Sequence, residues 1–215
     1  MPLITKVRKP EAEAEPEHLE KVEQRFYVRW VINVKGILGS TIPHKAVVVE
    51  DPPRKIPISF RYGKGIHIIR KPWSYMIGHF TPHGGYLRSS IFFSYDKLKS
   101  ESERRLLLVP LTNITYTNLS YVRPCICLGR DYVGGTGLKS RAIHLNELFW
   151  GTRFNGEIGV GSGAKPAWGE ALIGEELVRK WEGKSKGDDL IEFRKAPRNM
   201  SSVNAAMKWL QKYIT

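Results

Sequence analysis

The sequence predicts a β-rich α+β protein in which an antiparallel sheet, sandwich or barrel is followed by two C-terminal helices. Short runs of aromatic and β-branched residues recur between residues 25 and 128, and glycine and proline separate them. Helical spacing of apolar residues is found mainly near the end of the chain. A hydrophobic content of 41% and an aromatic content of 11% indicate a folded core and exclude a mainly disordered chain.

The first 25 residues differ in composition from the rest of the chain. They contain five Lys and Arg against six Glu, a net charge of −1, and few aliphatic side chains. We therefore expect a flexible polar leader over residues 1–25 and a single basic β-rich domain over residues 26–215. The excess of positive charge belongs to that domain.

Strand candidates follow one another along the first part of the domain. The first, RFYVRWVINV at 25–34, alternates roughly between aromatic or β-branched and polar residues, and KAVVVE at 45–50 is a short β-branched run. Turn signals such as Pro52 with Pro53 and Gly84 with Gly85 bound the strands. The remaining candidates are 56–62, 66–70, 89–95, 105–109, 113–117 and 120–128.

Two helices are predicted near the C-terminus. Segment 168–183 has apolar residues at four-residue spacing, and segment 201–214 has an apolar stripe after a serine that can cap a helix. The residues are Ile173, Leu177 and Trp181 in the first segment, and Ser201 or Ser202, Val203, Ala206, Met207, Leu210 and Ile214 in the second. We expect both helices to cover a face of the sheet.

The charge balance favours a polyanionic partner. The chain has 34 Lys and Arg against 21 Asp and Glu, a net charge of +13, and its isoelectric point is about 9.8. Nucleic acid, an anionic membrane surface and an acidic protein all fit this charge. Two cysteines and the lack of an N-terminal apolar run predict a reducing, cytoplasmic location. No stretch has the ~20 apolar residues of a transmembrane segment.

Residues 52–99, which we call the basic window, combine cations with aromatic rings. They contain nine Lys and Arg, one acid (Asp96) and nine of the 23 aromatic residues. Cations neutralise phosphates and aromatic rings stack on unpaired bases, so this composition predicts contact with single-stranded nucleic acid. The alternative is a passive sheet with core aromatics and a solvated basic face. The candidate nucleic-acid-binding residues are Arg54, Lys55, Arg61, Lys64, Arg70, Lys71, Trp73, Tyr75, Arg88, Lys139, Arg141 and Lys165.

Two glycine-rich stretches extend this candidate surface. Segment 159–171, GVGSGAKPAWGEA, has three glycines at the spacing Gly-x-Gly-x5-Gly-x-Gly, with Ala171 in the last position. It resembles the glycine-rich loop of RAMP-type CRISPR RNA-binding proteins, and segment 134–149 resembles a helix start of that family except that Arg141 comes early. The resemblance covers about forty residues with two mismatches. It implies a ferredoxin-like βαββαβ fold that holds RNA by its backbone.

A zinc site is one candidate for chemistry. His79, His83, Cys125 and Cys127 are residues that bind zinc in proteins. Pro82 prevents the two histidines from sharing a helical face, and a Cys-x-Cys pair on a strand simply points both thiols to one side. We therefore expect buried cysteines on a core face and predict no metal and no cofactor.

Two further patterns concern catalysis. His44 beside Lys45, with Tyr27 upstream, could form a metal-free ribonuclease with the histidine as acid or base. We expect His44 instead to be an exposed loop residue. Segment GGTGLKS at 134–140 lacks the first glycine of a P-loop and the glycine before its lysine, which argues against a nucleotide hydrolase. We expect a loop there.

These patterns predict a non-catalytic nucleic-acid-binding subunit of a multi-subunit ribonucleoprotein, with single-stranded RNA as the favoured ligand. Its other partners would be protein subunits or further copies of itself. The alternative is a viral structural protein, capsid or matrix, that packages genome or binds an anionic membrane and would be found in a virion. A third hypothesis, a His-based ribonuclease, predicts cleavage that is lost in His44→Ala.

Overall fold

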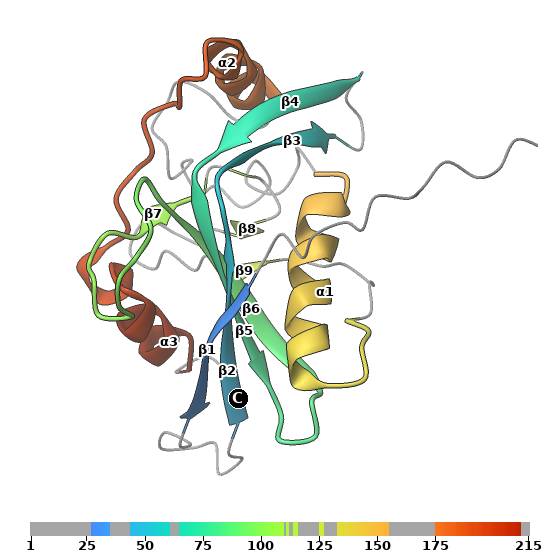
Figure 1. The fold of residues 1–215 in the computed structure, drawn as a ribbon, viewed down its shortest axis with the longest axis vertical. Helices are drawn as coiled ribbons and strands as arrows, with labels where there is room; N and C mark the ends of the chain where they lie inside the picture. Colours follow the sequence, from blue (N-terminus) through green and yellow to red (C-terminus); the bar gives the residue numbers. More distant parts are fainter. Residues whose placement is uncertain are drawn as a thin grey trace, which may run out of the picture.

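The computed structural model describes residues 27–34, 44–60, 65–109, 111, 114–115, 125–126, 133–154 and 175–211. Within these residues the strands form an antiparallel meander, and helices lie against both of its faces (Figure 1). The predicted leader at 1–25 and the segment 155–174 lie outside the described residues.

The larger sheet has seven strands in the described part of the chain. Their order is β1, β2, β5, β6, β9 and β8, and β7 pairs with β6 off this path. Every pairing is antiparallel, and the path is open rather than closed into a barrel. The strands of both sheets are β1 (Tyr27–Val34), β2 (His44–Asp51), β3 (Arg54–Ser59), β4 (Ile66–Lys71), β5 (Trp73–Phe80), β6 (Tyr86–Ser94), β7 (Leu107–Leu108), β8 (Ile114–Thr115) and β9 (Cys125–Ile126).

The second sheet, which we call the ribbon, consists of β3 and β4 and continues the two central strands β2 and β5. Pro52 and Pro53 separate β2 from β3, and Pro72 separates β4 from β5. Proline cannot donate an N–H to a ladder, so the pairing is interrupted at the same level on both strands. We call residues 51–54 and 71–74 the bend, because here the ribbon turns away from the sheet (Figure 1).

Helices cover the strands from three directions. The described helices are α1 (Leu138–Gly151), α2 (Glu175–Lys186), the 3₁₀ helix η1 (Arg198–Met200) and α3 (Val203–Gln211). α1 lies along one face of the large sheet, α3 packs on the other face, and α2 lies on the ribbon against β4 (Figure 1). Ser202 caps α3 as predicted, because its hydroxyl accepts a hydrogen bond from the N–H of Ala205 at 3.2 Å.

The alternation of side chains along β2 supplies both faces. Val47 and Val49 belong to the core on the α1 face, whereas Ala46 and Val48 belong to the core on the α3 face. All four are fully buried. A strand that is buried on both faces has a continuous apolar sequence instead of an alternating one. This explains the run AVVV at the centre of β2.

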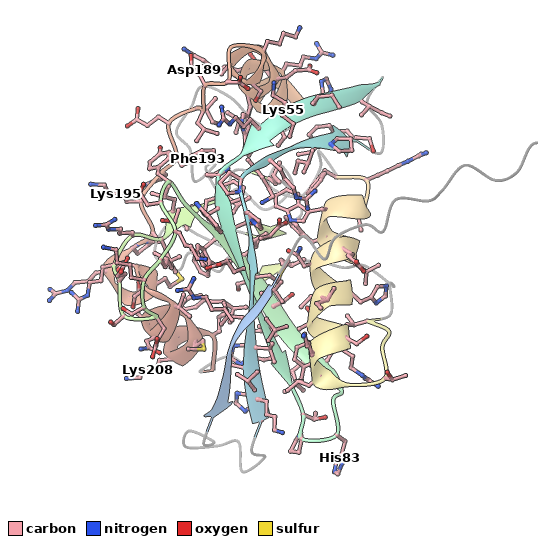
Figure 2. The ribbon with its side chains drawn as sticks, in the orientation of Figure 1. Lys55, His83, Asp189, Phe193, Lys195 and Lys208 are labelled. Atoms are coloured by element: carbon pink, nitrogen blue, oxygen red, sulfur yellow. The ribbon has the colours of Figure 1, made fainter. Side chains whose placement is uncertain are left out.

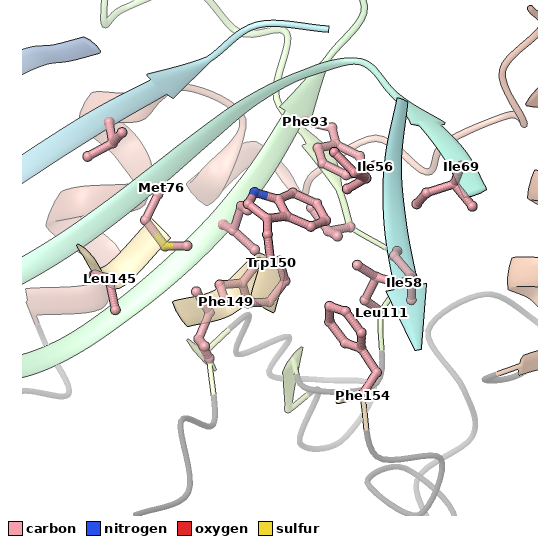
Figure 3. Close-up of a cluster of buried hydrophobic side chains, with 14 of the residues drawn as sticks. Ile56, Ile58, Ile69, Met76, Phe93, Leu111, Leu145, Phe149, Trp150 and Phe154 are labelled. Atoms are coloured by element: carbon pink, nitrogen blue, oxygen red, sulfur yellow. The ribbon is translucent and has the colours of Figure 1, made fainter. Parts of the chain in front are cut away.

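The core on the α1 face is rich in aromatic rings. Phe93 of β6 stacks on Trp150 of α1, with ring centroids 6.2 Å apart and 4° between the ring planes. Trp181 of α2 packs edge-on against Phe93 at 5.9 Å. Figure 3 shows Phe93 and Trp150 beside Ile56 of the ribbon. One core therefore joins the sheet, the ribbon, α1 and α2.

The predicted β-rich antiparallel class and the two C-terminal helices are confirmed, but the sequence prediction missed two elements. Within β5, Ser74, Gly78 and His79 are buried among apolar residues, so the strand shows neither alternation nor a continuous apolar run. The helix α1 begins directly after the glycine-rich stretch, and the predicted loop is limited to the residues before Leu138.

Candidate nucleic-acid interface

The interior of the bend contains two of the predicted binding cations. Lys71 is fully buried, and its ammonium lies 3.2 Å from the carboxylate of Asp51. It also donates hydrogen bonds to the main-chain oxygens of Asp51 and Pro52, at 3.0 and 2.6 Å. Arg54 pairs with the same carboxylate at 3.0 Å. One buried acid therefore pairs with two cations of the basic window and balances one of their two positive charges.

Lys71 supports the structure of the bend. Burial lowers the pKa of Lys71 from 10.5 to about 8, although the negative charge of Asp51 opposes this shift. The ammonium also lies 5.8 Å from the ring centroid of Trp150, within the range of a cation–π contact. At pH 7 Lys71 is charged, and its hydrogen bonds to the carbonyl oxygens of Asp51 and Pro52 lie where proline interrupts the ladder. Its charge is used inside the protein and is not presented at the surface.

Lys55 and Arg70 lie on the solvent side of the ribbon and share one acid. The Lys55 ammonium and the Arg70 guanidinium are 3.0 and 3.5 Å from the same carboxylate oxygen of Asp188. The hydrogen bond from Lys55 lowers the pKa of Asp188. All three side chains are more than a third exposed, so water screens these ion pairs and both cations remain accessible. Figure 2 shows Lys55 on the ribbon.

The two predicted stacking residues do not offer free ring faces. Trp73 is half-buried against the core on the α3 face, and the Lys97 ammonium lies 5.3 Å from its ring centroid. Tyr75 is fully buried, and its hydroxyl accepts a hydrogen bond from the N–H of Leu98 at 2.7 Å. Burial raises the pKa of the Tyr75 hydroxyl. Tyr75 is therefore a core residue.

The other predicted residues are spread over the molecule. Arg88 lies on β6 directly opposite His79 of β5. Arg141, in the first turn of α1, donates hydrogen bonds to the main-chain oxygens of Gly84 and Gly135 at 2.7 and 3.0 Å, whereas Lys139 is exposed. Arg61, Lys64 and Lys165 lie outside the described residues, as does the whole RAMP-like glycine segment at 159–171.

The glycine-rich loop before α1 borders a hollow of 710 Å³ that Lys139 and His144 also line. His144 accepts a hydrogen bond through Nδ1 from the N–H of Gly134 at 2.8 Å. Gly135 has φ 122°, and a Cβ there would lie 2.9 Å from the main-chain nitrogen of Arg141, so glycine is required. With no acid in its first turn, the helix start is compatible with an anion.

The structure also assembles a second basic surface that the sequence prediction missed. We call it the basic groove, a hollow of 520 Å³ that four cations and one acid line. All four cations are exposed. Of these four, only Arg105 has an ion pair within the described residues, with 3.4 Å between its guanidinium and the carboxylate of the exposed Asp96. The lining residues are Ser94, Tyr95, Asp96, Arg104, Arg105, Leu106, Leu107, Lys195, Ala196, Arg198 and Ser201. The four cations against one acid give the groove a charge of +3.

Main-chain hydrogen bonds fix the walls of the basic groove. The segment 194–201 runs beside β7, and the N–H of Leu108 donates to the oxygen of Arg194 at 2.8 Å. The N–H groups of Ala196 and Leu106 donate to the oxygens of Leu106 and Ser201, each at 3.0 Å. Leu106, Leu107 and Ala196 are buried between these hydrogen bonds, whereas the four cations of the groove are exposed to solvent. Figure 2 shows Lys195 projecting from this side of the molecule.

The predicted zinc set is not assembled in the described residues. His79 is fully buried, whereas His83 is exposed in the turn between β5 and β6 (Figure 2). Cys125 pairs with Ser90 of β6, so a whole strand separates its backbone from β5. No group of three His, Cys, Asp or Glu residues able to hold a metal ion occurs in the part that the structure describes. The side chains of both cysteines lie outside it.

His44 differs from the sequence prediction. It is 3% exposed and begins β2, so the expectation of an exposed loop residue is wrong. Its ring centroid lies 5.3 Å from that of His79. An acid or base for RNA cleavage must reach its substrate, and a ring enclosed in this way does not offer that access.

Comparisons with family models, curated proteins and solved structures find no match for this chain. In the residues that the structure describes, no helix has both the length and the apolar character needed to cross a membrane. The evidence for the candidate interface therefore comes from the structure of this chain alone.

The sequence contained a signal for the basic groove. The runs ERR at 103–105 and FRKAPR at 193–198 are basic, but each has only two or three cations. They are about ninety residues apart, and pairing of 106–108 with 194–196 brings them together. Only in the basic window do Lys and Arg lie close enough together in the sequence to predict a binding surface.

Proposed function

We propose that this protein is a non-catalytic nucleic-acid-binding subunit of a multi-subunit ribonucleoprotein and that it holds single-stranded RNA along the basic groove. One observation carries the proposal. In the described residues, the cations of the groove are exposed and almost free of acidic partners, whereas Arg54 and Lys71 both pair with the buried Asp51. A chain with net charge +13 thus keeps a concentrated positive surface beside an aromatic ring.

The chemistry of the groove suits phosphate. Guanidinium groups of Arg104, Arg105 and Arg198 can each donate two parallel hydrogen bonds to phosphate oxygens, and Lys195 adds a compact charge. Tyr95 is 47% exposed, and its hydroxyl accepts a hydrogen bond from the N–H of Phe193 at 2.9 Å. That contact holds the ring in place beside the cations, where an unpaired base can stack on it. Arginine and lysine stay protonated at pH 7, which fits binding without acid–base catalysis.

The direct test measures fluorescence anisotropy of labelled single-stranded RNA with the nuclease-treated protein. The groove variant changes Arg104, Arg105, Lys195 and Arg198 to Gln. We expect a roughly 100-fold loss of affinity, and a fall of about 3 in the slope of log affinity against log salt, since each single-strand phosphate contact contributes about 0.7. Duplex DNA should bind more weakly than the single strand, because its bases are not available for stacking.

A matched control removes the same charge elsewhere. Lys180, Lys184, Lys186 and Lys208 are exposed on α2 and α3, away from the groove. Their simultaneous change to Gln lowers the net charge equally, so a specific groove predicts a much smaller loss. Equal losses in the two variants would contradict the proposal and indicate non-specific attraction.

The same proteins separate the viral alternative from the ribonucleoprotein. Binding to anionic phospholipid vesicles that the groove variant abolishes, with weak binding of RNA, would favour a matrix protein. Large particles that form without nucleic acid in size-exclusion chromatography would favour a capsid subunit. A monomer or small oligomer that assembles only with RNA or partner chains supports the proposed function.

A further inference from the structure

A polar cluster lies inside the protein at the end of the large sheet remote from the ribbon. His79 on β5 pairs directly with Arg88 on β6, and side chains of directly opposite residues lie on the same face. His44 of β2 belongs to the same face, because its ring lies 5.3 Å from that of His79. Ser90, two residues after Arg88, follows on that face. We call these four residues the internal polar cluster.

Three residues of the internal polar cluster are buried and Arg88 is half-buried, and within the described residues several of their polar atoms have no hydrogen-bond partner. His44 and His79 are 3% and 0% exposed, and Ser90 is fully buried. All four imidazole nitrogens, the Ser90 hydroxyl and one terminal nitrogen of Arg88 are buried without a hydrogen bond. Buried polar groups in proteins are almost always hydrogen-bonded, and buried charges are paired. Six such atoms in one place therefore require a common explanation.

The surrounding described elements supply no free acid. β1, β5, β6 and α3 contain no Asp or Glu. The two acids of β2, Glu50 and Asp51, lie at its opposite end, where they pair with Arg29 and Lys97 and with Arg54 and Lys71, respectively. The Arg88 guanidinium thus stands beside two imidazoles with no negative charge to balance it.

The composition of the cluster distinguishes between ligand classes. A guanidinium beside the histidines repels a metal ion, and two imidazoles without a third ligand do not complete a zinc site. An anion, in contrast, can accept hydrogen bonds from Arg88, from one N–H of each neutral imidazole and from the Ser90 hydroxyl. Tetrahedral oxyanions present acceptors in the several directions that such a set of donors requires.

We propose that His44, His79, Arg88 and Ser90 form an internal binding site for a small oxyanion of the phosphate or sulfate type. The site is separate from the basic groove and does not depend on the proposed function. Because both imidazoles are buried, the site suits a free ion and not a phosphate of a polymer. Bound in this way, the ion acts as a structural counter-ion that ties β2, β5 and β6 together.

The protonation of His79 provides an independent test of the site. Burial, together with the neighbouring His44 and Arg88, lowers the pKa of His79 from 6.5 to about 3. A bound anion opposes this shift, since it favours the charged imidazole. By linkage, binding of an anion must then strengthen as the pH falls. Sulfate is the best probe, because its own charge stays constant over this range.

The test measures the thermal midpoint of the full-length protein in sodium sulfate and in sodium chloride at equal ionic strength, at pH 6 and pH 8. We expect a higher midpoint in sulfate, with a larger difference at pH 6. Arg88→Gln should lower the affinity for sulfate about tenfold or more, the usual cost of losing a charge-assisted hydrogen bond. Arg153→Gln, at an exposed position outside both the internal polar cluster and the basic groove, is the matched control and should retain the full sulfate effect.

General salt effects of sulfate appear equally in every variant, so an equal response of Arg88→Gln and wild type would overturn the proposal. If Arg88→Gln does not fold, the imidazole signals of the wild type provide the readout. Sulfate should shift the NMR resonances of His44 and His79 and leave the exposed His83 unchanged. Stabilisation by Zn²⁺ but not by sulfate would also overturn it. RNA binding by Arg88→Gln should stay normal, which separates this result from failure of the groove proposal.

Discussion

The bend and the basic groove use the same side chains in opposite ways. At the bend, Lys71 and Arg54 surround the buried Asp51, and the resulting ion pairs stabilise a break between two sheets. In the groove, four exposed cations face one exposed acid and contribute little to stability. Density of positive charge in the sequence therefore does not locate a binding surface. The position of the acids decides which cations remain available.

The largest expected effect is at the bend. Lys71→Met removes the only ammonium of the bend and leaves Arg54 as the remaining cation beside the buried Asp51 carboxylate, which also accepts a hydrogen bond from the Asn146 amide at 3.4 Å. Breaking a buried pair by removing one partner typically costs about 3 to 5 kcal/mol of unfolding free energy. Urea denaturation at pH 7 measures this loss. RNA affinity of the folded fraction should stay unchanged, because Lys71 does not reach the surface.

A double variant controls for the change in shape. Lys71→Met combined with Asp51→Asn removes both charges and should recover a substantial part of the lost stability. A loss below about 1 kcal/mol in Lys71→Met alone would contradict the structural role of this lysine. If Lys71→Met lost RNA binding but kept the stability of the wild type, Lys71 would instead be a residue that contacts RNA.

The second effect concerns acid sensitivity at the opposite end of β5. The pKa of His79 is about 3 in the folded protein and 6.5 in the unfolded chain. The unfolded state therefore binds more protons below pH 6.5, and this contribution to stability is lost as the pH falls towards 3. With chloride as the only added anion, we expect a loss of roughly 3 kcal/mol between pH 7 and pH 4 from this residue. Denaturation of wild type and His79→Leu at both pH values isolates the contribution, and a parallel loss in both proteins would refute it.

A smaller effect is expected where α2 meets the ribbon. The Ser185 hydroxyl accepts a hydrogen bond from the N–H of Arg70 at 2.7 Å and donates one to the oxygen of Trp181 at 2.8 Å. Ser185→Ala leaves the strand N–H without a partner and should cost about 1 to 2 kcal/mol. Ser102→Ala, at an exposed position, is the control and should leave the denaturation midpoint unchanged. Equal behaviour of the two variants would show that α2 does not support the ribbon in this way.

The smallest effect is expected for the exposed acid of the ribbon. Asp188 has φ 61°, a conformation that asparagine also tolerates, so Asp188→Asn removes the ion pairs with Lys55 and Arg70 without backbone strain. Stability should change barely measurably. Anisotropy measurements should show unchanged RNA affinity, because the proposed RNA site is the basic groove and not the ribbon. A clear gain in affinity would mean that the freed ribbon cations contact RNA, and the basic window would regain its predicted role.

Much of the fold could be predicted from residue patterns, and the failures have physical causes. β2 and β4 are marked by β-branched runs, and α3 by an apolar stripe after a serine cap. β5 lies between neighbours on both sides and has cores on both faces, but the buried Ser74 and His79 interrupt the continuous apolar run that such a strand usually has and so hide its pattern. α1 follows a glycine-rich loop whose composition suggested that the loop continued.

The candidate site was harder to predict, because it depends on which distant residues meet. Asp51 lies one residue before the basic window, and Asp188 lies almost ninety residues after it. Each pairs with two cations that appear unopposed in the sequence. The basic groove arises from two short runs that only the pairing of 194–196 with β7 joins. Charge could be counted from the sequence, but its compensation could not.

The contact between α2 and β4 also affects how the protein behaves in a crowded solution. The outer edge of β4 has main-chain groups that could template another strand, and α2 occupies them: Glu182 accepts the N–H of Ile68, and Trp181 donates to the oxygen of Arg70. Side chains of a helix thus replace the neighbouring strand that a ribbon edge would otherwise recruit from a second molecule. Ile66 and Ile68 are exposed beside this edge, at 67% and 44%. Because α2 covers this edge, the ribbon with its exposed isoleucines is less able to pair with a strand of another molecule and aggregate.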